Sequence, residues 1–131
     1  MLLTEIDHVA IAVNDLEAAI DYYARAFGAS VDHREVVESD GVEEALLKVA
    51  ESYIQLLTPT RDDIPVAKAL AKRGEGLHHI GWLTTDLKGE IERATAKGAK
   101  VWTSSFPEGN PGFCYLEGSE VGNLAIELRE P

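Results

Sequence analysis

Two pairs of polar residues in this chain carry side chains that could bind a divalent metal ion. His8 and His79 stand in similar segments, Ile-Asp-His-Val and Leu-His-His-Ile, and are 79 − 8 = 71 residues apart. Gln55 and Glu127 each stand between an isoleucine and a leucine. A carboxylate inside an aliphatic strand costs several kcal/mol unless it is paired or bound to a metal. Two imidazoles, one amide and one carboxylate suit a divalent metal with open coordination positions.

Each of these residues also has a simpler interpretation. A single histidine on a strand is more often structural than a ligand, and Glu127 could face water from an edge strand. The metal interpretation depends on a repeat, because the four residues occupy equivalent positions in two similar halves. Ile6–Val13 continues as Asn-Asp-Leu, and Leu77–Thr84 continues as Thr-Asp-Leu. The repeat therefore favours one shared site over four unrelated side chains.

The spacing of apolar residues predicts the same element order in both halves: a strand, a helix and three further strands. In the first half, a helix with apolar residues at Leu16, Ile20, Tyr23 and Phe27 ends at Gly28, with Asn14 or Asp15 as its cap. The extended segments after it are Val31–Val37, Val42–Val49 and Tyr53–Thr58. The second half has a helix over about Asp86–Gly98 and extended segments at about Ala99–Thr103, Gly112–Leu116 and Leu124–Arg129.

We therefore expect an α+β fold made of two tandem βαβββ modules in a single domain over residues 1–131. Module one covers about residues 4–60 and module two about residues 76–131. A linker segment of about residues 61–75 holds a short helix, Val66–Arg73, with Pro65 in its first turn.

Strand alternation predicts which side chains share a face. Val9, Ile11 and Val13 should pack on the helix, whereas His8 shares the other face with Ala10 and Ala12. In the second copy His79 shares a face with Gly81, and His78 shares one with Ile80 and Trp82. His79 is therefore the candidate ligand, and His78 is predicted to be structural.

The overall charge limits the partners of this 131-residue chain. Lys and Arg number 12 against 23 Asp and Glu, which gives a net charge of −11. Such a field repels polyanions, so we expect neither a nucleic acid nor an anionic membrane as partner. The single cysteine, Cys114, cannot form an internal disulfide. With no apolar stretch of membrane-spanning length and no recognisable signal sequence, we expect a soluble cytoplasmic protein.

Several segments together resemble the vicinal oxygen chelate superfamily and, within it, the methylmalonyl-CoA epimerases. The similarity covers nearly the whole chain and is most specific in Ile6–Val13, Gly41–Ala45, Tyr53–Thr60, Val66–Ile80 and Ile126–Leu128. The resemblance implies a curved mixed sheet around a metal cleft, and in general a homodimer.

The resemblance also implies the roles of individual residues. His8, Gln55, His79 and Glu127 would bind a divalent metal, with cobalt or manganese preferred over zinc, nickel or magnesium. Glu44 matches the second acidic residue of the family and would be one acid/base; Glu127 would be the other or support it. Without the resemblance, Glu44 is simply a solvated carboxylate on a strand. The implied reaction interconverts the (R) and (S) forms of methylmalonyl-CoA by α-proton abstraction through a metal-stabilised enediolate.

Departures from the family pattern leave other functions open. Epimerases usually carry Phe-Leu-His-Pro-Lys where this chain has Tyr115–Ser119, and the preceding loop, Ser104–Gly112, is also atypical. The alternatives are an isomerase like lactoylglutathione lyase, another metal-dependent enzyme of the same fold, and a non-catalytic protein that sequesters an antibiotic. Gln55 argues against the first, because those lyases tend to have Glu there. For a CoA substrate, we expect a local basic group to bind the phosphates: Arg61, Lys68, Lys72 and Arg73.

Overall fold

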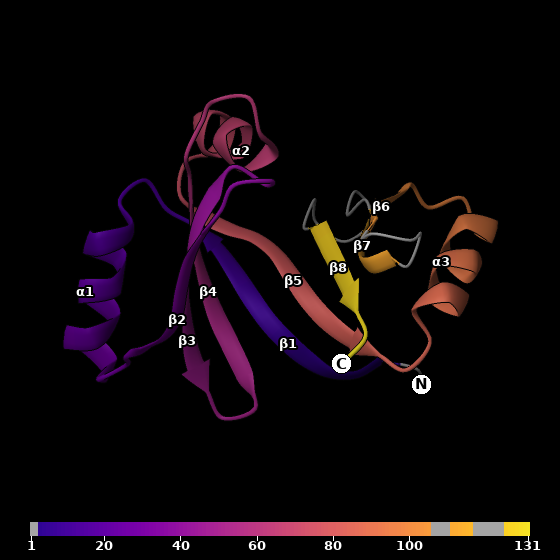
Figure 1. Ribbon diagram of the computed structural model, residues 1–131, viewed down its shortest axis with the longest axis horizontal. Helices are drawn as coiled ribbons and strands as arrows, with labels where there is room; N and C mark the ends of the chain where they lie inside the picture. Colours follow the sequence, from indigo (N-terminus) through magenta and orange to yellow (C-terminus); the bar gives the residue numbers. More distant parts are fainter. Residues whose placement is uncertain (1–2, 106–110, 117–124) are drawn as a thin grey trace. The chain divides into compact units, whose positions relative to one another are not determined.

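The predicted order of elements, βαβββ repeated twice, is present in the computed structural model of the chain (Figure 1). The structure describes residues 3–105, 111–116 and 125–131, with side chains described for 3–101 and 126–131. Two compact units make up the chain: one comprises His8–His78, and the other comprises Met1–Asp7 together with His79–Pro131. The first half contains β1 (Leu3–Ala12), α1 (Leu16–Phe27), β2 (Val31–Val37), β3 (Val42–Val49), β4 (Ser52–Pro59) and α2 (Pro65–Arg73). The second half contains β5 (Gly76–Thr84), α3 (Leu87–Ala96), β6 (Val101–Ser105), β7 (Pro111–Leu116) and β8 (Ala125–Arg129).

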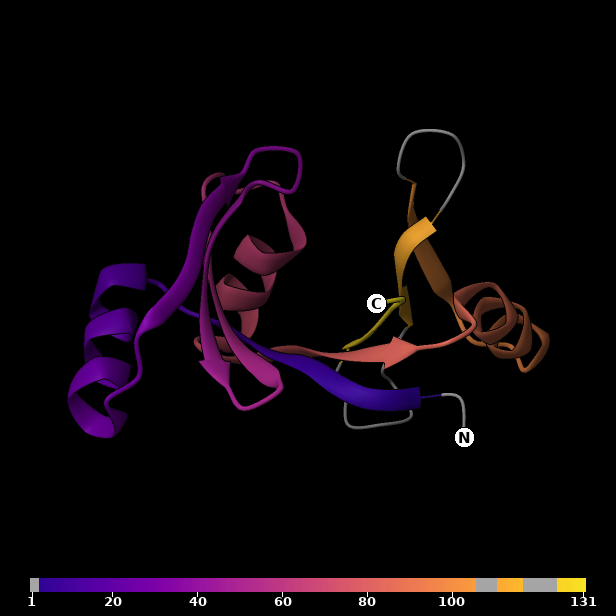
Figure 2. The same cartoon turned by 60° about the horizontal axis from the view of Figure 1, so that its bottom comes forward.

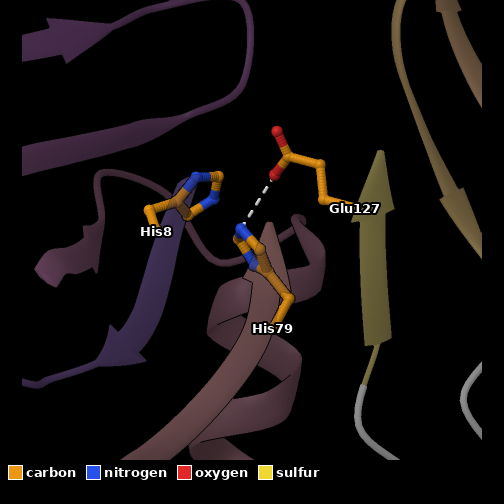
Figure 3. Close-up of side chains that lie close together, drawn as sticks. All are labelled: His8, His79 and Glu127. Carbon is orange, nitrogen blue, oxygen red and sulfur yellow. Dashed lines mark ion pairs between the residues drawn. The ribbon is translucent and has the colours of Figure 1, made fainter. Parts of the chain in front are cut away.

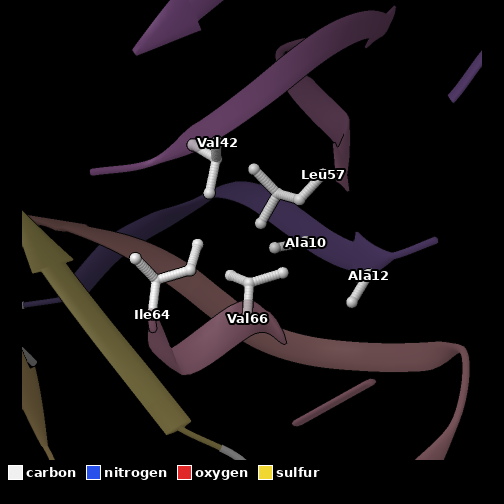
Figure 4. Packing of buried hydrophobic residues seen from close by; sticks show 6 residues of the cluster. All are labelled: Ala10, Ala12, Val42, Leu57, Ile64 and Val66. Atoms are coloured by element: carbon white, nitrogen blue, oxygen red, sulfur yellow. The ribbon is translucent and has the colours of Figure 1, made fainter. Parts of the chain in front are cut away.

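In the unit His8–His78, a helix lies on each face of a sheet with the strand order β2-β3-β4-β1 (Figures 1 and 2). β1 pairs with β4 in parallel, and the other neighbours pair antiparallel. The core under α1 combines Val13, Leu16, Ala45, Leu47 and Leu56. On the opposite face, α2 covers a second cluster, shown in Figure 4, of Ala10, Ala12, Val42, Leu57, Ile64 and Val66. One helix therefore packs on each face of the sheet. The helix α2 covers only a part of the face on which it lies.

The ends of α1 follow the predicted signals. The Asp15 side chain accepts a hydrogen bond from the backbone N–H of Ala18, and Gly28 ends the helix in the left-handed conformation with φ 68°. Leu16, Ile20 and Tyr23 pack in the core as their spacing predicts. Phe27 does not: it is 70% exposed and its ring contacts those of Tyr22 and Tyr23. The last turn of the helix extends past the edge of the core, so helical spacing alone overestimated its burial.

The second unit repeats the strand topology of the first, with the order β5-β8-β7-β6, but its described residues contain a single helix, α3 (Leu87–Ala96). β5 and β8 pair in parallel, and β7 pairs antiparallel with both β6 and β8. The N-cap of α3 is Asp86, which accepts from the backbone N–H of Gly89. Leu87 and Leu128 form the buried centre of this core. Among the helices in the described residues, none is long and apolar enough to cross a membrane.

Candidate functional site

Strand register places three of the candidate residues on one face of the sheet of the unit His8–His78. Gln55 lies opposite Ala10 of β1, two residues from His8, and opposite Leu46 of β3, two residues from Glu44. Because residues two apart on a strand point to the same side, His8, Glu44 and Gln55 share a face. We call this the site face. The alternation predicted for the first strand is confirmed at Ile11 and Val13, which pack on the α1 side with Ala45, Leu47 and Leu56.

Gln55 has one satisfied and one unsatisfied end. Its Nε2 donates a hydrogen bond to Glu44 Oε2. Its Oε1 is buried and has no hydrogen-bond partner among the described residues. A buried amide oxygen without a donor costs free energy, which a cation would recover. The orientation of this amide therefore fits the metal-ligand role, because the atom left without a partner is the one that can bind a cation.

Glu44 contacts a second carboxyl group as well as the amide. Glu35 lies directly opposite it in the β2–β3 pair, and the two side chains share a hydrogen bond. Burial raises the pKa of Glu44, the Gln55 hydrogen bond opposes this shift, and Glu35 adds to it. The pKa of Glu35 is lowered, chiefly by its hydrogen bond with His33. The two neighbouring carboxyl groups therefore differ in pKa, with that of Glu44 shifted upward and that of Glu35 downward.

His33 completes this group, and neither it nor Glu35 was among the residues expected from the sequence. His33 Nε2 lies 3.2 Å from Glu35 Oε1, and both side chains are half exposed. A signal for them was present: pairing Val37 with Val42 across the turn puts Glu35 opposite Glu44. Counting back along that hairpin would have identified both residues.

The opposite face of the same hairpin carries a separate ion-pair group. Arg34 Nε lies 3.0 Å from Glu43 Oε2, and Arg34 also pairs with Glu17 of α1. Glu43 lies next to Glu44 in sequence but on the face that α1 covers, where Arg34 neutralises its carboxylate. Two adjacent glutamates therefore have different partners.

In the second unit, His79 and Glu127 form a buried ion pair (Figure 3). His79 Nε2 lies 2.9 Å from Glu127 Oε2, and the side chains are 3% and 7% exposed. Glu127 lies opposite Gly81, two residues from His79, so both residues occupy one face. Arg129 Nε lies 3.8 Å from the other carboxylate oxygen, Glu127 Oε1. Each oxygen of this buried carboxylate therefore faces a nitrogen-bearing side chain.

The two candidate histidines lie where the chain passes between the units. β1 crosses between Asp7 and His8, and β5 crosses between His78 and His79. His8 and His79 are both buried, with exposed fractions of 4% and 3%. His78 is less buried than His79.

Three expectations fall partly or wholly beyond the described side chains. Residues 117–119 of the atypical Tyr115–Ser119 segment lie outside the described residues. So do residues 106–110 of the loop Ser104–Gly112, and the side chain of Cys114.

Comparison with known proteins places the chain in a family. Residues 7–116 match the Glyoxalase/Bleomycin resistance protein/Dioxygenase superfamily, so the chain belongs to it.

Several relatives within this superfamily are named as epimerases. The chain is 31% identical to the ethylmalonyl-CoA/methylmalonyl-CoA epimerase of Cereibacter sphaeroides, covering 98% of this chain and 99% of that one. Methylmalonyl-CoA epimerase from Mycobacterium tuberculosis has a similar crystal structure, with a TM-score of 0.86, 32% identity and coverage of 99% and 89%. A variant of the Streptomyces coelicolor enzyme in complex with 2-nitronate-propionyl-CoA gives a TM-score of 0.84 and 38% identity, covering 96% of both chains.

Proposed function

We propose that this protein is a metal-dependent epimerase that interconverts the (R) and (S) forms of methylmalonyl-CoA. The observation that carries the proposal is the half-buried Glu44, which lies on the same sheet face as His8 and Gln55 and whose pKa is raised by burial. The similarity to epimerases over 98% of the chain supports the same conclusion. An epimerase needs such a carboxyl group, because it must remove and return a proton at one carbon.

We propose His8, Gln55, His79 and Glu127 as the metal ligands. The donor set fits a divalent cation, and the partnerless Gln55 Oε1 supports it. Within the second unit, the contact of 2.9 Å between His79 Nε2 and Glu127 Oε2 supports the inclusion of both residues.

When bound, the metal ion would act as a Lewis acid that stabilises negative charge developing on the substrate oxygens. Cobalt or manganese is the ion that the family resemblance favours. His79 would keep Glu127 oriented through their ion pair, as a carboxylate and an imidazole at a metal commonly do.

Glu44 and Glu127 are proposed as the two acid/base groups. Burial raises the pKa of Glu44, which suits a group that must both give a proton to the α-carbon and take one from it. Glu127 is a buried carboxylate and would serve the opposite face of the substrate. Two carboxyl groups in different environments suit a two-base reaction, since one must be protonated while the other is not.

Lys68, Lys72 and Arg73 are proposed to bind the phosphates of CoA. All three are exposed on α2, whose Val66 packs in the core. Arg61, which the sequence placed in this group, is engaged elsewhere: its Nη1 donates to the Glu38 carbonyl at 3.0 Å, and its Nε to Asp63. The proposal therefore rests on the three helix residues.

Proton NMR of methylmalonyl-CoA in heavy water tests the function directly. We expect the α-proton to exchange for deuterium in the presence of the metal-loaded protein, and EDTA to abolish the exchange. Absence of exchange with a metal-loaded sample would contradict the epimerase proposal and leave only the superfamily. A protein that takes up no metal when it is added would instead favour the antibiotic-binding alternative.

A further inference from the structure

A line of hydrogen-bonded side chains crosses three strands on the site face. His33 and Glu35 come from the edge strand β2, Glu44 from β3 and Gln55 from β4. Ligand atoms of His33, Glu35 and Glu44 all lie within 4.8 Å of one another. The line ends at the buried Gln55 Oε1. It therefore connects the solvent-exposed edge of the sheet to an atom that we assign to the metal.

The order of partners along this line decides which end of the Gln55 amide points away from Glu44. An amide group has a donor end and an acceptor end of nearly the same shape, so a neighbour must select between them. Glu44 accepts from Nε2, which leaves Oε1 on the other side. Without a fixed acceptor at Glu44, the amide could rotate and direct its donor end toward the cation.

Glu44 itself needs a partner to stay in place. Register sets Glu35 directly opposite it, and two carboxylates in that position repel each other. His33 counters this repulsion, because its Nε2 lies 3.2 Å from Glu35 Oε1 and the ligand atoms of His33, Glu35 and Glu44 all lie within 4.8 Å of one another. Burial alone would not hold the Glu35 and His33 side chains in place, since both are half exposed.

We propose that Glu35 and His33 are positioning residues, which hold the Glu44 carboxyl group against the Gln55 amide so that Gln55 presents its oxygen to the metal. Neither residue touches the substrate or the metal in this scheme. The inference rests on the proposed function, because it needs Gln55 to be a metal ligand.

Metal affinity is the first measurement, made by competition between the purified protein and a chromophoric chelator for Co²⁺ or Mn²⁺. Removal of a residue that orients a metal ligand lowers affinity by roughly 10- to 100-fold, so we expect Glu35→Ala to raise the Kd about tenfold. Glu35→Gln retains a hydrogen-bonding group toward Glu44 and should stay within about threefold of the parent protein. In the same way His33→Gln, which retains a donor near Nε2, should bind more tightly than His33→Ala.

A matched control separates positioning from general loss of stability. Glu43→Ala removes a carboxylate from the same hairpin, but on the face where Glu43 pairs with Arg34. Thermal unfolding should show comparable destabilisation for Glu43→Ala and Glu35→Ala, whereas only the latter should weaken metal binding. Equal loss of metal affinity in both variants would overturn the proposal in favour of a structural effect.

The decisive measurement combines Glu35→Ala with Gln55→Glu. A carboxylate has oxygen at both ends, so it needs no neighbour to choose its orientation. We therefore expect Glu35→Ala to have no effect on metal affinity in the Gln55→Glu background. The same loss in both backgrounds would overturn the proposal.

The number of metal ions bound per protein chain distinguishes the remaining outcomes. One equivalent of metal in the parent protein agrees with the inference, whereas a second equivalent that Glu35→Ala abolishes would make the cluster itself a cation site and overturn it. No metal uptake by the parent protein would overturn the proposed function and this inference together. Uptake that is insensitive to Glu35 would overturn the inference alone.

Discussion

Glu44 has two partners of different kinds, and together they define what it can do. The Gln55 amide donates to one of its oxygens, and the carboxyl group of Glu35 lies directly opposite it and helps to raise its pKa. A carboxyl group with a raised pKa suits general acid and general base catalysis near neutral pH. Glu127 differs, because its buried carboxylate faces His79 and Arg129.

The substitution Glu44→Gln tests the acid/base role of this side chain. The amide keeps an oxygen that can accept from Gln55 but cannot transfer a proton, so we expect metal binding to persist. Epimerisation should fall by on the order of a hundredfold or more. The measurement is the turnover of methylmalonyl-CoA at saturating substrate, alongside the metal content. Unchanged turnover would remove Glu44 from the mechanism.

The sequence predicted some site residues and missed others for identifiable reasons. The repeat matched His79 with His8 and Glu127 with Gln55, and within one unit the structure brings His79 and Glu127 to 2.9 Å from each other. Glu35 and His33 were missed because their importance comes from strand pairing across the hairpin, which residue types do not indicate. The partnerless Gln55 Oε1 could not be predicted at all, since it depends on the rotamer of a single amide.

Among the secondary-structure elements, the β2–β3 hairpin has the most direct effect on the site, because it carries both Glu35 and Glu44. Its turn is held at Gly41, whose carbonyl accepts from the Thr60 N–H at 2.8 Å and whose φ is 68°. A Cβ placed on Gly41 would lie 2.8 Å from Arg61 Cζ and 2.9 Å from Ile64 Cγ2. Ile64 is buried in the core, so it cannot move aside at low cost.

Substitution of Gly41 by alanine should therefore destabilise the protein more than the same change at Gly28. Both glycines have φ 68°, but nothing lies within 4 Å of a Cβ at Gly28. The backbone cost alone predicts a loss of about 1 kcal/mol for Gly28→Ala, whereas added crowding predicts about 2–4 kcal/mol for Gly41→Ala. Urea unfolding of the two variants measures the difference. Equal losses would show that the turn relaxes around the new methyl group.

The element boundaries were largely predictable, because local rules fix them. β2 and β3 span Val31–Val37 and Val42–Val49 as expected, and Asp15 and Gly28 cap α1. β1 begins earlier than its alternating pattern suggested, since the residues before His8 pair as part of the other unit. The exposure of Phe27 was not predictable from helical spacing, which indicates a face but not where the opposing sheet ends.

For the molecule as a whole, the distribution of charge matters more than its sum. The net charge of −11 should repel a polyanion, yet residues 51–100 hold 8 basic and 7 acidic residues. Lys68, Lys72 and Arg73 lie exposed on one helix within this segment. A phosphorylated substrate small enough to lie near α2 is affected mainly by these charges, because distant ones are screened beyond about 8–10 Å.

Replacing Lys68, Lys72 and Arg73 together by alanine tests whether the local charge binds the CoA phosphates. Three solvent-exposed contacts of about 0.3–0.5 kcal/mol each predict a rise in KM of roughly five- to tenfold, with a weaker dependence of KM on salt. The control replaces Lys88, Lys97 and Lys100, which lie in or just after α3 and are exposed. Both variants change the net charge from −11 to 9 − 23 = −14. A local effect predicts a raised KM only in the α2 variant, whereas a general field effect predicts the same rise in both, and an unchanged KM in the α2 variant would reject this placement of the phosphates.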